Sequence, residues 1–264
     1  MMYIIKLFNH NHLLFVSLPR SCKNIVMKYP IGIQDFEKMR NDGYVYIDKT
    51  ALVYEMADTG SYYFLSRPRR FGKSLLISTM EAYFSGKREL FKGLAIEQLE
   101  KDWTKYPILH LDLNTAKYDE TDSLDKVLND TLNLWESDYG TSPTEVTLEL
   151  RFKGIIRRAC EKAGERVVIL VDEYDKPLLE AINDDKLQDD FRATLKAFYA
   201  VLKTQDQYIK FAFLTGVTKF GKVSIFSDLN NLDDISMWNE YVEICGVSER
   251  EIHENLETEL HEFA

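Results

Sequence analysis

The fold is decided by the stretch Tyr62-Tyr63-Phe64-Leu65-Ser66-Arg67-Pro68-Arg69-Arg70-Phe71-Gly72-Lys73-Ser74-Leu75-Leu76. An apolar strand pattern opens this stretch, and helical spacing of apolar residues begins after Gly72. Between them, Gly72-Lys73-Ser74 is the second half of the pattern G-x-x-x-x-G-K-[ST], in which backbone N–H groups and a helix N-terminus bind phosphate. Because a strand precedes the motif and a helix follows it, we expect a phosphate-binding loop here.

The loop departs from the general pattern at one position. Arg67 stands five residues before Gly72, where the pattern has its first glycine. A side chain there restricts the backbone dihedrals, but arginines in the loop add positive charge that suits phosphate. We expect Lys73 to reach the β and γ oxygens of a nucleotide and Ser74 to be a ligand of Mg²⁺. The expected nucleotide-binding residues are Arg67, Arg69, Arg70, Phe71, Gly72, Lys73, Ser74 and Leu75.

Two adjacent carboxylates follow a second strand pattern. Val167–Val171 is entirely apolar and leads directly into Asp172 and Glu173. A carboxylate at the C-terminal edge of a parallel strand is well placed for a nucleotide-bound Mg²⁺. We therefore assign Asp172 to the metal and Glu173 to the general base that polarises the attacking water. The alternative for the doublet alone is a solvated turn, but its pairing with Gly72-Lys73-Ser74 favours the functional assignment.

A polar residue ends a third strand pattern, Ile209–Leu214. Thr215 follows it directly, and a hydroxyl at the tip of a neighbouring strand can bind the attacking water or the γ-phosphate. We therefore include Thr215 with Glu173 among the catalytic candidates. A hydroxyl that only caps the loop is an equally good interpretation, so both remain open.

Alternating strand and helix patterns predict the fold class. The strand patterns are Tyr62–Ser66, Ile108–Leu113, Arg166–Val171 and Ile209–Thr215, and the helix patterns are Lys73–Tyr83, Ser123–Trp135, Glu145–Ala163 and Lys186–Lys203. Such alternation favours an α/β protein with a parallel sheet covered on both faces. Together with the loop, it predicts a P-loop NTPase-like three-layer sandwich with a mainly parallel central sheet. Ser142 and Pro143 are expected to begin the third helix.

Composition limits the classes of partner. Among the 264 residues, 43 acidic and 33 basic side chains leave a net charge of −10, so the surface as a whole cannot attract nucleic acid. A nucleic-acid or protein partner would have to use a local patch such as the basic loop. No apolar run reaches the roughly 18 residues of a membrane span. The three cysteines are far apart, which suits a reducing compartment. We expect a cytoplasmic protein without a membrane partner.

Further motifs resemble the AAA-ATPase-like family of bacterial proteins. They are Tyr29-Pro30-Ile31-Gly32-Ile33-Gln34-Asp35-Phe36, Tyr46-Ile47-Asp48-Lys49-Thr50, Val171-Asp172-Glu173-Tyr174-Asp175-Lys176-Pro177, Leu214-Thr215-Gly216-Val217 and Ser224-Ile225-Phe226-Ser227. The resemblance covers almost everything after Met27. Arg-Pro-Arg-Arg-Phe-Gly-Lys-Ser is the family's own version of the loop, so Arg67 is part of the resemblance.

The resemblance implies a P-loop NTPase with a catalytic glutamate, ordinarily followed by a PD-(D/E)XK nuclease-like domain. Regular patterning begins only after Met27, so we expect residues 1–26 to be a disordered extension or an artefact of start-site choice. An AAA-ATPase-like domain over residues 27–264 follows it, truncated at its C-terminal end. The expected function is ATP binding with Mg²⁺-dependent hydrolysis. The alternative is a nucleotide-gated module that binds nucleic acid or protein without useful hydrolysis, and an oligomer is compatible with either.

Overall fold

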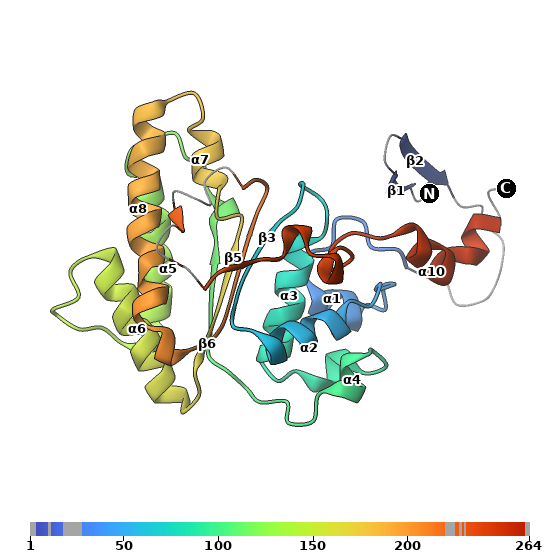
Figure 1. Ribbon diagram of the computed structural model, residues 1–264, viewed down its shortest axis with the longest axis horizontal. Coiled ribbons are helices and arrows are strands. Elements are labelled where there is room, and N and C mark those ends of the chain that lie inside the picture. Colours follow the sequence, from blue (N-terminus) through green and yellow to red (C-terminus); the bar gives the residue numbers. More distant parts are fainter. Residues whose placement is uncertain are drawn as a thin grey trace.

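A parallel β-sheet forms the centre of the protein (Figure 1). The computed structural model describes residues 4–9, 12–17, 28–219, 225–226, 229 and 231–261. In this part of the chain the sheet has five strands in the order β4-β5-β6-β3-β7, and all neighbours are parallel. The strands are β3 (Tyr62–Ser66), β4 (Ile108–Asp112), β5 (Val167–Asp172), β6 (Ile209–Gly216) and β7 (Asp233–Asp234). The four strand patterns of the sequence are thereby confirmed.

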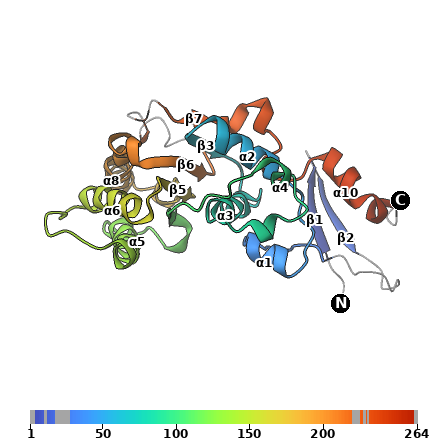
Figure 2. The same cartoon turned by 90° about the horizontal axis from the view of Figure 1, so that it is seen from below.

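Helices cover both faces of this sheet. Those of the described chain are α1 (Phe36–Asn41), α2 (Thr50–Thr59), α3 (Lys73–Phe84), α4 (Ile96–Leu99), α5 (Ser123–Tyr139), α6 (Leu148–Ala163), α7 (Lys176–Glu180), α8 (Asp185–Thr204) and α10 (Glu249–His261). Figures 1 and 2 show α5, α6 and α8 on one face and α1 to α4 on the other. The predicted three-layer α/β sandwich is confirmed. None of these helices combines the length and the hydropathy that crossing a bilayer requires.

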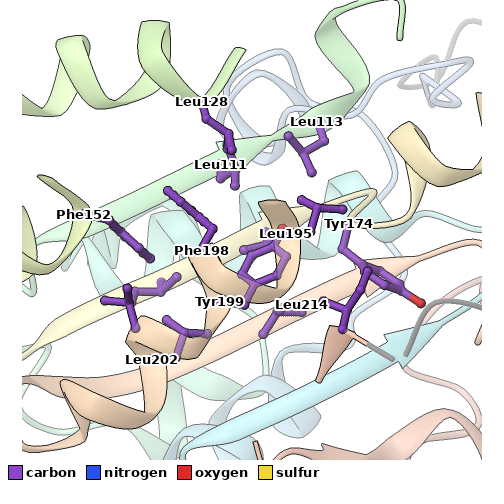
Figure 3. Close-up of a cluster of buried hydrophobic side chains, with 14 of the residues drawn as sticks. Leu111, Leu113, Leu128, Phe152, Tyr174, Leu195, Phe198, Tyr199, Leu202 and Leu214 are labelled. Carbon is purple, nitrogen blue, oxygen red and sulfur yellow. The ribbon is translucent and has the colours of Figure 1, made fainter. Parts of the chain in front are cut away.

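The strands build two separate cores because successive side chains point to opposite faces. In β3, Tyr62 and Phe64 belong to the core under α5, α6 and α8, whereas Tyr63 and Leu65 belong to the core under α2 and α3. Figure 3 shows the first of these cores. There the rings of Phe152 and Phe198 stack 4.4 Å apart. Burying each such side chain contributes about 1.5–3 kcal/mol, so these cores fix the strands whose ends form the site.

One helix begins later than its sequence pattern predicts. α6 starts at Leu148, and Thr147 accepts the capping hydrogen bond from the amide of Leu150, at 3.4 Å. Glu145, where the helical pattern of the sequence starts, instead folds back along the helix and binds Arg158, with 2.6 Å between Nη1 and Oε1. The prediction that Ser142 caps this helix is therefore wrong, because Thr147 caps it instead.

Residues before the central domain form a separate hairpin. β1 (Ile4–Asn9) pairs antiparallel with β2 (His12–Ser17), and both views place the hairpin near α10 (Figures 1 and 2). The division into an extension of residues 1–26 and a domain of residues 27–264 stays a prediction.

Candidate functional site

Three strand ends meet at one edge of the sheet. β6 lies between β3 and β5, and all three run parallel. Leu65 is the register partner of Thr215, and Val171 is the partner of Leu214. The C-terminal ends of parallel strands share an edge, so the loop after β3, the acidic doublet after β5 and Thr215 converge there. The predicted site residues thus come from three separate parts of the sequence.

The loop enters α3 through a left-handed turn. Gly72 has φ +86° and its carbonyl accepts from the amide of Leu76, at 2.9 Å. Glycine adopts this conformation without steric cost, and an added Cβ would find open space with only the Gly246 amide at 4.0 Å. The turn exposes Gly72 at the N-terminus of a twelve-residue helix, where unpaired N–H groups and the helix dipole favour an anion.

Lys73 lies inside the loop. Its side chain is 3% exposed, and Nζ donates to the carbonyls of Arg67, at 2.9 Å, and Pro68, at 3.2 Å. The same ammonium lies 3.1 Å from Oε1 of Glu173. A buried cation needs such partners, and these three oxygens stabilise the Lys73 ammonium in its place.

Oxygen donors suited to a hard cation lie beside the lysine. The hydroxyl of Ser74 donates to Oδ2 of Asp172, and the hydroxyl of Thr215 donates to Oδ1, each at 2.6 Å. No cluster of three or more His, Cys, Asp or Glu side chains able to hold a metal occurs within the described residues. Mg²⁺ is usually bound by one or two carboxylates together with substrate phosphates and water. The Ser74 and Asp172 oxygens fit that pattern.

Glu173 occupies a strained position at the end of β5. Its φ is +57°, which is uncommon for a residue with a side chain and is found at functional sites. The amide of Glu173 donates to the Thr215 hydroxyl, at 3.3 Å, and the next amide, from Tyr174, donates to the Thr215 carbonyl, at 2.8 Å. Burial raises the pKa of Glu173 in spite of the nearby Lys73 ammonium. Thr215 therefore touches both members of the doublet, and its catalytic role stays a prediction.

The side chains of the remaining predicted loop residues lie away from this network. The Arg67 guanidinium donates to the carbonyls of Ser236, at 2.6 Å, and Tyr241, at 3.2 Å. Arg69 and Arg70 are exposed, and no acidic partner is found for either in the described chain. Two other predicted residues pack against the protein: the Phe71 ring lies against Gly246, and Leu75 packs on the core under α2 and α3.

Sequence reasoning missed Asp175. Its buried carboxylate accepts from the amides of Val217, at 3.1 Å, and Thr218, at 2.8 Å, and from the Thr218 hydroxyl, at 2.8 Å. Asp175 stands directly before α7, where an aspartate ordinarily caps the helix, but it makes no capping hydrogen bond. It fixes the loop after β6 instead, and so helps to hold Thr215 against Glu173.

An acidic pocket of about 220 Å³ opens beside Ser74 and Asp172. Its other lining residues are Gln34, Asp35, Ser78, Glu81, His110, Asp112 and Asn114. Asp112 is the register partner of Asp172, which brings two strand-end carboxylates side by side. Because lysine and arginine are missing from this lining, the pocket does not suit a triphosphate.

Two other proteins are similar to this chain. An uncharacterized protein in the vnfD 5′ region of Azotobacter chroococcum mcd 1 is 41% identical over 227 residues, which are 85% of this chain and 44% of that protein. The chain thus spans less than half the length of this relative. The Aeropyrum pernix ORC2 protein, in its ADPNP–ADP complexes, aligns with 90% of this chain and 54% of its own, at 10% identity. Its TM-score is 0.38, so this likeness carries no argument.

The family comparison covers most of the domain. The family model described as Predicted AAA-ATPase matches residues 30–226. This range contains the loop with Lys73, the doublet Asp172-Glu173 and Thr215. The chain therefore belongs to the AAA-ATPase-like family.

Proposed function

We propose that the protein binds ATP and hydrolyses it in a Mg²⁺-dependent reaction. One observation carries the proposal: Lys73 contacts Glu173 while the neighbouring Ser74 contacts Asp172, so a phosphate-binding loop and an acidic doublet share one edge of the sheet. Family membership supports nucleotide binding in general. The Mg²⁺ dependence and the hydrolysis are inferred from the residues.

Each residue has a distinct task in this proposal. The N-terminus of α3 and Lys73 bind the phosphates, and Lys73 exchanges its contact with Glu173 for phosphate oxygens. Ser74 and Asp172 hold Mg²⁺, which when bound neutralises negative charge on the phosphates. Once Lys73 has moved to phosphate, Glu173 is free to accept a proton from the attacking water. Its raised pKa suits that role.

Thr215 completes the arrangement. Its hydroxyl donates to Asp172 and accepts from the Glu173 amide, so it fixes the two carboxylates relative to one another. From this position beside both carboxylates, the hydroxyl would orient the attacking water.

A second candidate function rests on the two exposed arginines. Arg69 and Arg70 project from the loop into solvent, and a nucleotide in the loop would order them for an anionic partner such as nucleic acid or an acidic protein surface. In that case the protein is a nucleotide-gated binding module. Occupancy of the site, and not turnover, would then be the functional event.

Phosphate release separates the two functions. An ATPase releases phosphate, and Glu173→Gln lowers the rate by about 10²–10⁴-fold while ATP remains bound. The exposed Glu161 of α6 supplies the control, since Glu161→Gln makes the same change away from the site. Binding of ATP without phosphate release by the wild type would favour the binding module. Failure to bind ATP or GTP, with or without Mg²⁺, would overturn both functions.

A further inference from the structure

Arg67 connects the phosphate-binding loop to a distant part of the chain. Its guanidinium donates to the carbonyls of Ser236, at 2.6 Å, Tyr241, at 3.2 Å, and Ser66, at 3.1 Å. The first two carbonyls lie about 170 residues further along the sequence. Hydrogen bonds from an ionised guanidinium are among the stronger ones in proteins.

The backbone of Arg67 belongs to the site itself. Its amide donates to the carbonyl of Gly216, at 3.1 Å, directly after Thr215. Its carbonyl accepts from Nζ of Lys73, at 2.9 Å. A displacement of Arg67 would therefore move the oxygen that positions the lysine.

The distant chain is a segment that lies against the loop, residues 235–246, called here the C-terminal strap. The strap begins at Ile235, and Ser236 Oγ accepts from the amide of Ser66, at 2.9 Å. At its other end, Gly246 has φ +82°, and a Cβ added there would lie 3.3 Å from the Phe71 ring. The strap thus contacts the loop at both ends.

Apolar side chains anchor the strap between these ends. Ile235, Tyr241, Ile244 and Cys245 are buried in the same core as Leu76 of α3. The Arg67 guanidinium lies over this region and supplies N–H donors to strap carbonyls. The Tyr241 carbonyl also accepts from the Ile244 amide, at 3.2 Å. Buried carbonyls without donors are costly, so the arginine stabilises the strap chiefly through the Ser236 carbonyl.

We infer that Arg67 is a positioning residue: it fastens the C-terminal strap to the phosphate-binding loop, and nucleotide affinity depends on that attachment. The effect on nucleotide affinity rests on the proposed nucleotide binding, whereas the attachment of the strap does not. It also accounts for an arginine where the general loop pattern has glycine. The side chain acts on the strap, and the carbonyl of the same residue acts on Lys73.

Cys245 reports on the attachment without any nucleotide. Burial raises the pKa of its thiol to about 12, so the reactive thiolate is scarce while the strap is in place. Opening of the strap returns the thiol to water and to an ordinary pKa near 8.5, where it reacts with a disulfide reagent. The other cysteines, Cys22 and Cys160, are replaced by serine so that one thiol is measured.

The first experiment measures the rate of Cys245 labelling in nucleotide-free protein. Arg67→Ala is expected to speed labelling by about tenfold or more, because charge-assisted hydrogen bonds to the strap are lost. Arg67→Lys is expected to restore only part of the protection, since an ammonium cannot span the same carbonyls. Arg69→Ala removes an equal charge two residues away and should leave labelling unchanged.

The second experiment measures ATP affinity in the same variants. Arg67→Ala should lower the affinity for ATP by about tenfold or more, and the affinity of Arg67→Lys should lie between that of Arg67→Ala and that of the wild type. Arg157→Ala, on exposed α6 surface, is the control for loss of charge. If Arg67 acted only as a phosphate contact, Arg67→Ala would weaken ATP and leave Cys245 protected. That result would overturn the inference.

The two proposals fail in different ways. Faster labelling in Arg67→Ala, with no ATP binding by the wild type, would support the attachment of the strap and refute the proposed nucleotide function. Unchanged labelling, with normal ATP binding by the wild type, would refute the attachment of the strap alone. If Arg67→Ala does not fold, Arg67→Lys takes its place, since it keeps the charge but cannot span the carbonyls of Ser236 and Tyr241, and unchanged labelling in that variant would count against the inference.

Discussion

Lys73 and Glu173 face one another at the edge of the sheet, with 3.1 Å between Nζ and Oε1. They follow strands β3 and β5, which β6 separates. A phosphate that enters the loop must therefore compete with Glu173 for the lysine. This competition predicts that Glu173→Gln binds ATP at least as tightly as the wild type. Equilibrium titration with labelled ATP measures it, and weaker binding would show that the carboxylate supports the bound state.

Ser74 and Asp172 predict a metal-dependent defect. Ser74→Ala removes the hydroxyl that lies 2.6 Å from the Asp172 carboxylate, so half-maximal ATP binding should require about tenfold more Mg²⁺. Binding measured without Mg²⁺ should change little. The matched control is Ser78→Ala, because Ser78 lies one turn later on α3 and accepts from the Phe36 amide. An equal shift in both variants would argue against Ser74 as a ligand.

The junction between β6 and the doublet has no room for a side chain at Gly216. An added Cβ would lie 2.4 Å from the Tyr174 ring and 2.8 Å from Oδ1 of Asp175. Gly216→Ala should lower the free energy of unfolding by about 1–3 kcal/mol through overpacking. Gly164→Ala is the comparison, since that site has φ +72° but open space. Urea denaturation giving Gly216→Ala the smaller loss would contradict the close packing.

Glu81 and His110 predict a pH-dependent contribution to stability. His110 Nδ1 lies 3.3 Å from Glu81 Oε2. The hydrogen bond lowers the pKa of Glu81; burial alone would lower the pKa of His110, but Glu81, Asp112 and Asp172 outweigh it and the pKa is raised. The histidine's contribution is present below its ordinary pKa of 6.5 and lost as pH rises through the raised value. The glutamate's is present above its ordinary 4.5 and lost as pH falls through the lowered value.

The pair therefore stabilises the fold most between pH 4.5 and 6.5. Because both side chains are partly exposed, we expect about 0.5 kcal/mol or less. Unfolding free energies of the wild type and Glu81→Gln, measured from pH 4 to pH 9, should differ most inside that window. A difference that grows at alkaline pH would contradict the assignment.

The architecture was predictable because buried parallel strands have a simple sequence pattern. β5 is apolar from Val167 to Val171, and α3, α5 and α8 carry apolar residues at helical spacing. Such patterns place Asp172 and Thr215 at strand ends, and Lys73 at the start of a helix, before any coordinates are known. In contrast, β7 consists of Asp233 and Asp234 alone, and no apolar alternation marks it.

Contacts to backbone atoms were not predictable. Arg67 binds the carbonyls of Ser236 and Tyr241, and carbonyl groups leave no signature in a sequence. Its charge therefore suggested phosphate. Asp175 was missed for a similar reason, since its main partners are the amides of Val217 and Thr218. The charged residues in the sequence predicted where the site lies, but only the structure shows which atoms they bind.

The central claim is that the loop around Lys73 and the carboxylates of Asp172 and Glu173 form one site for Mg²⁺-bound ATP. Titration of labelled ATP in the presence of Mg²⁺, with the wild type and Lys73→Ala side by side, tests it most directly. We expect Lys73→Ala to lower the affinity for ATP by about 100-fold, because it removes a buried charge-assisted contact to phosphate. The control Lys92→Ala, on the exposed surface, should bind ATP as the wild type does. Equal ATP affinity in the wild type and Lys73→Ala would contradict the account.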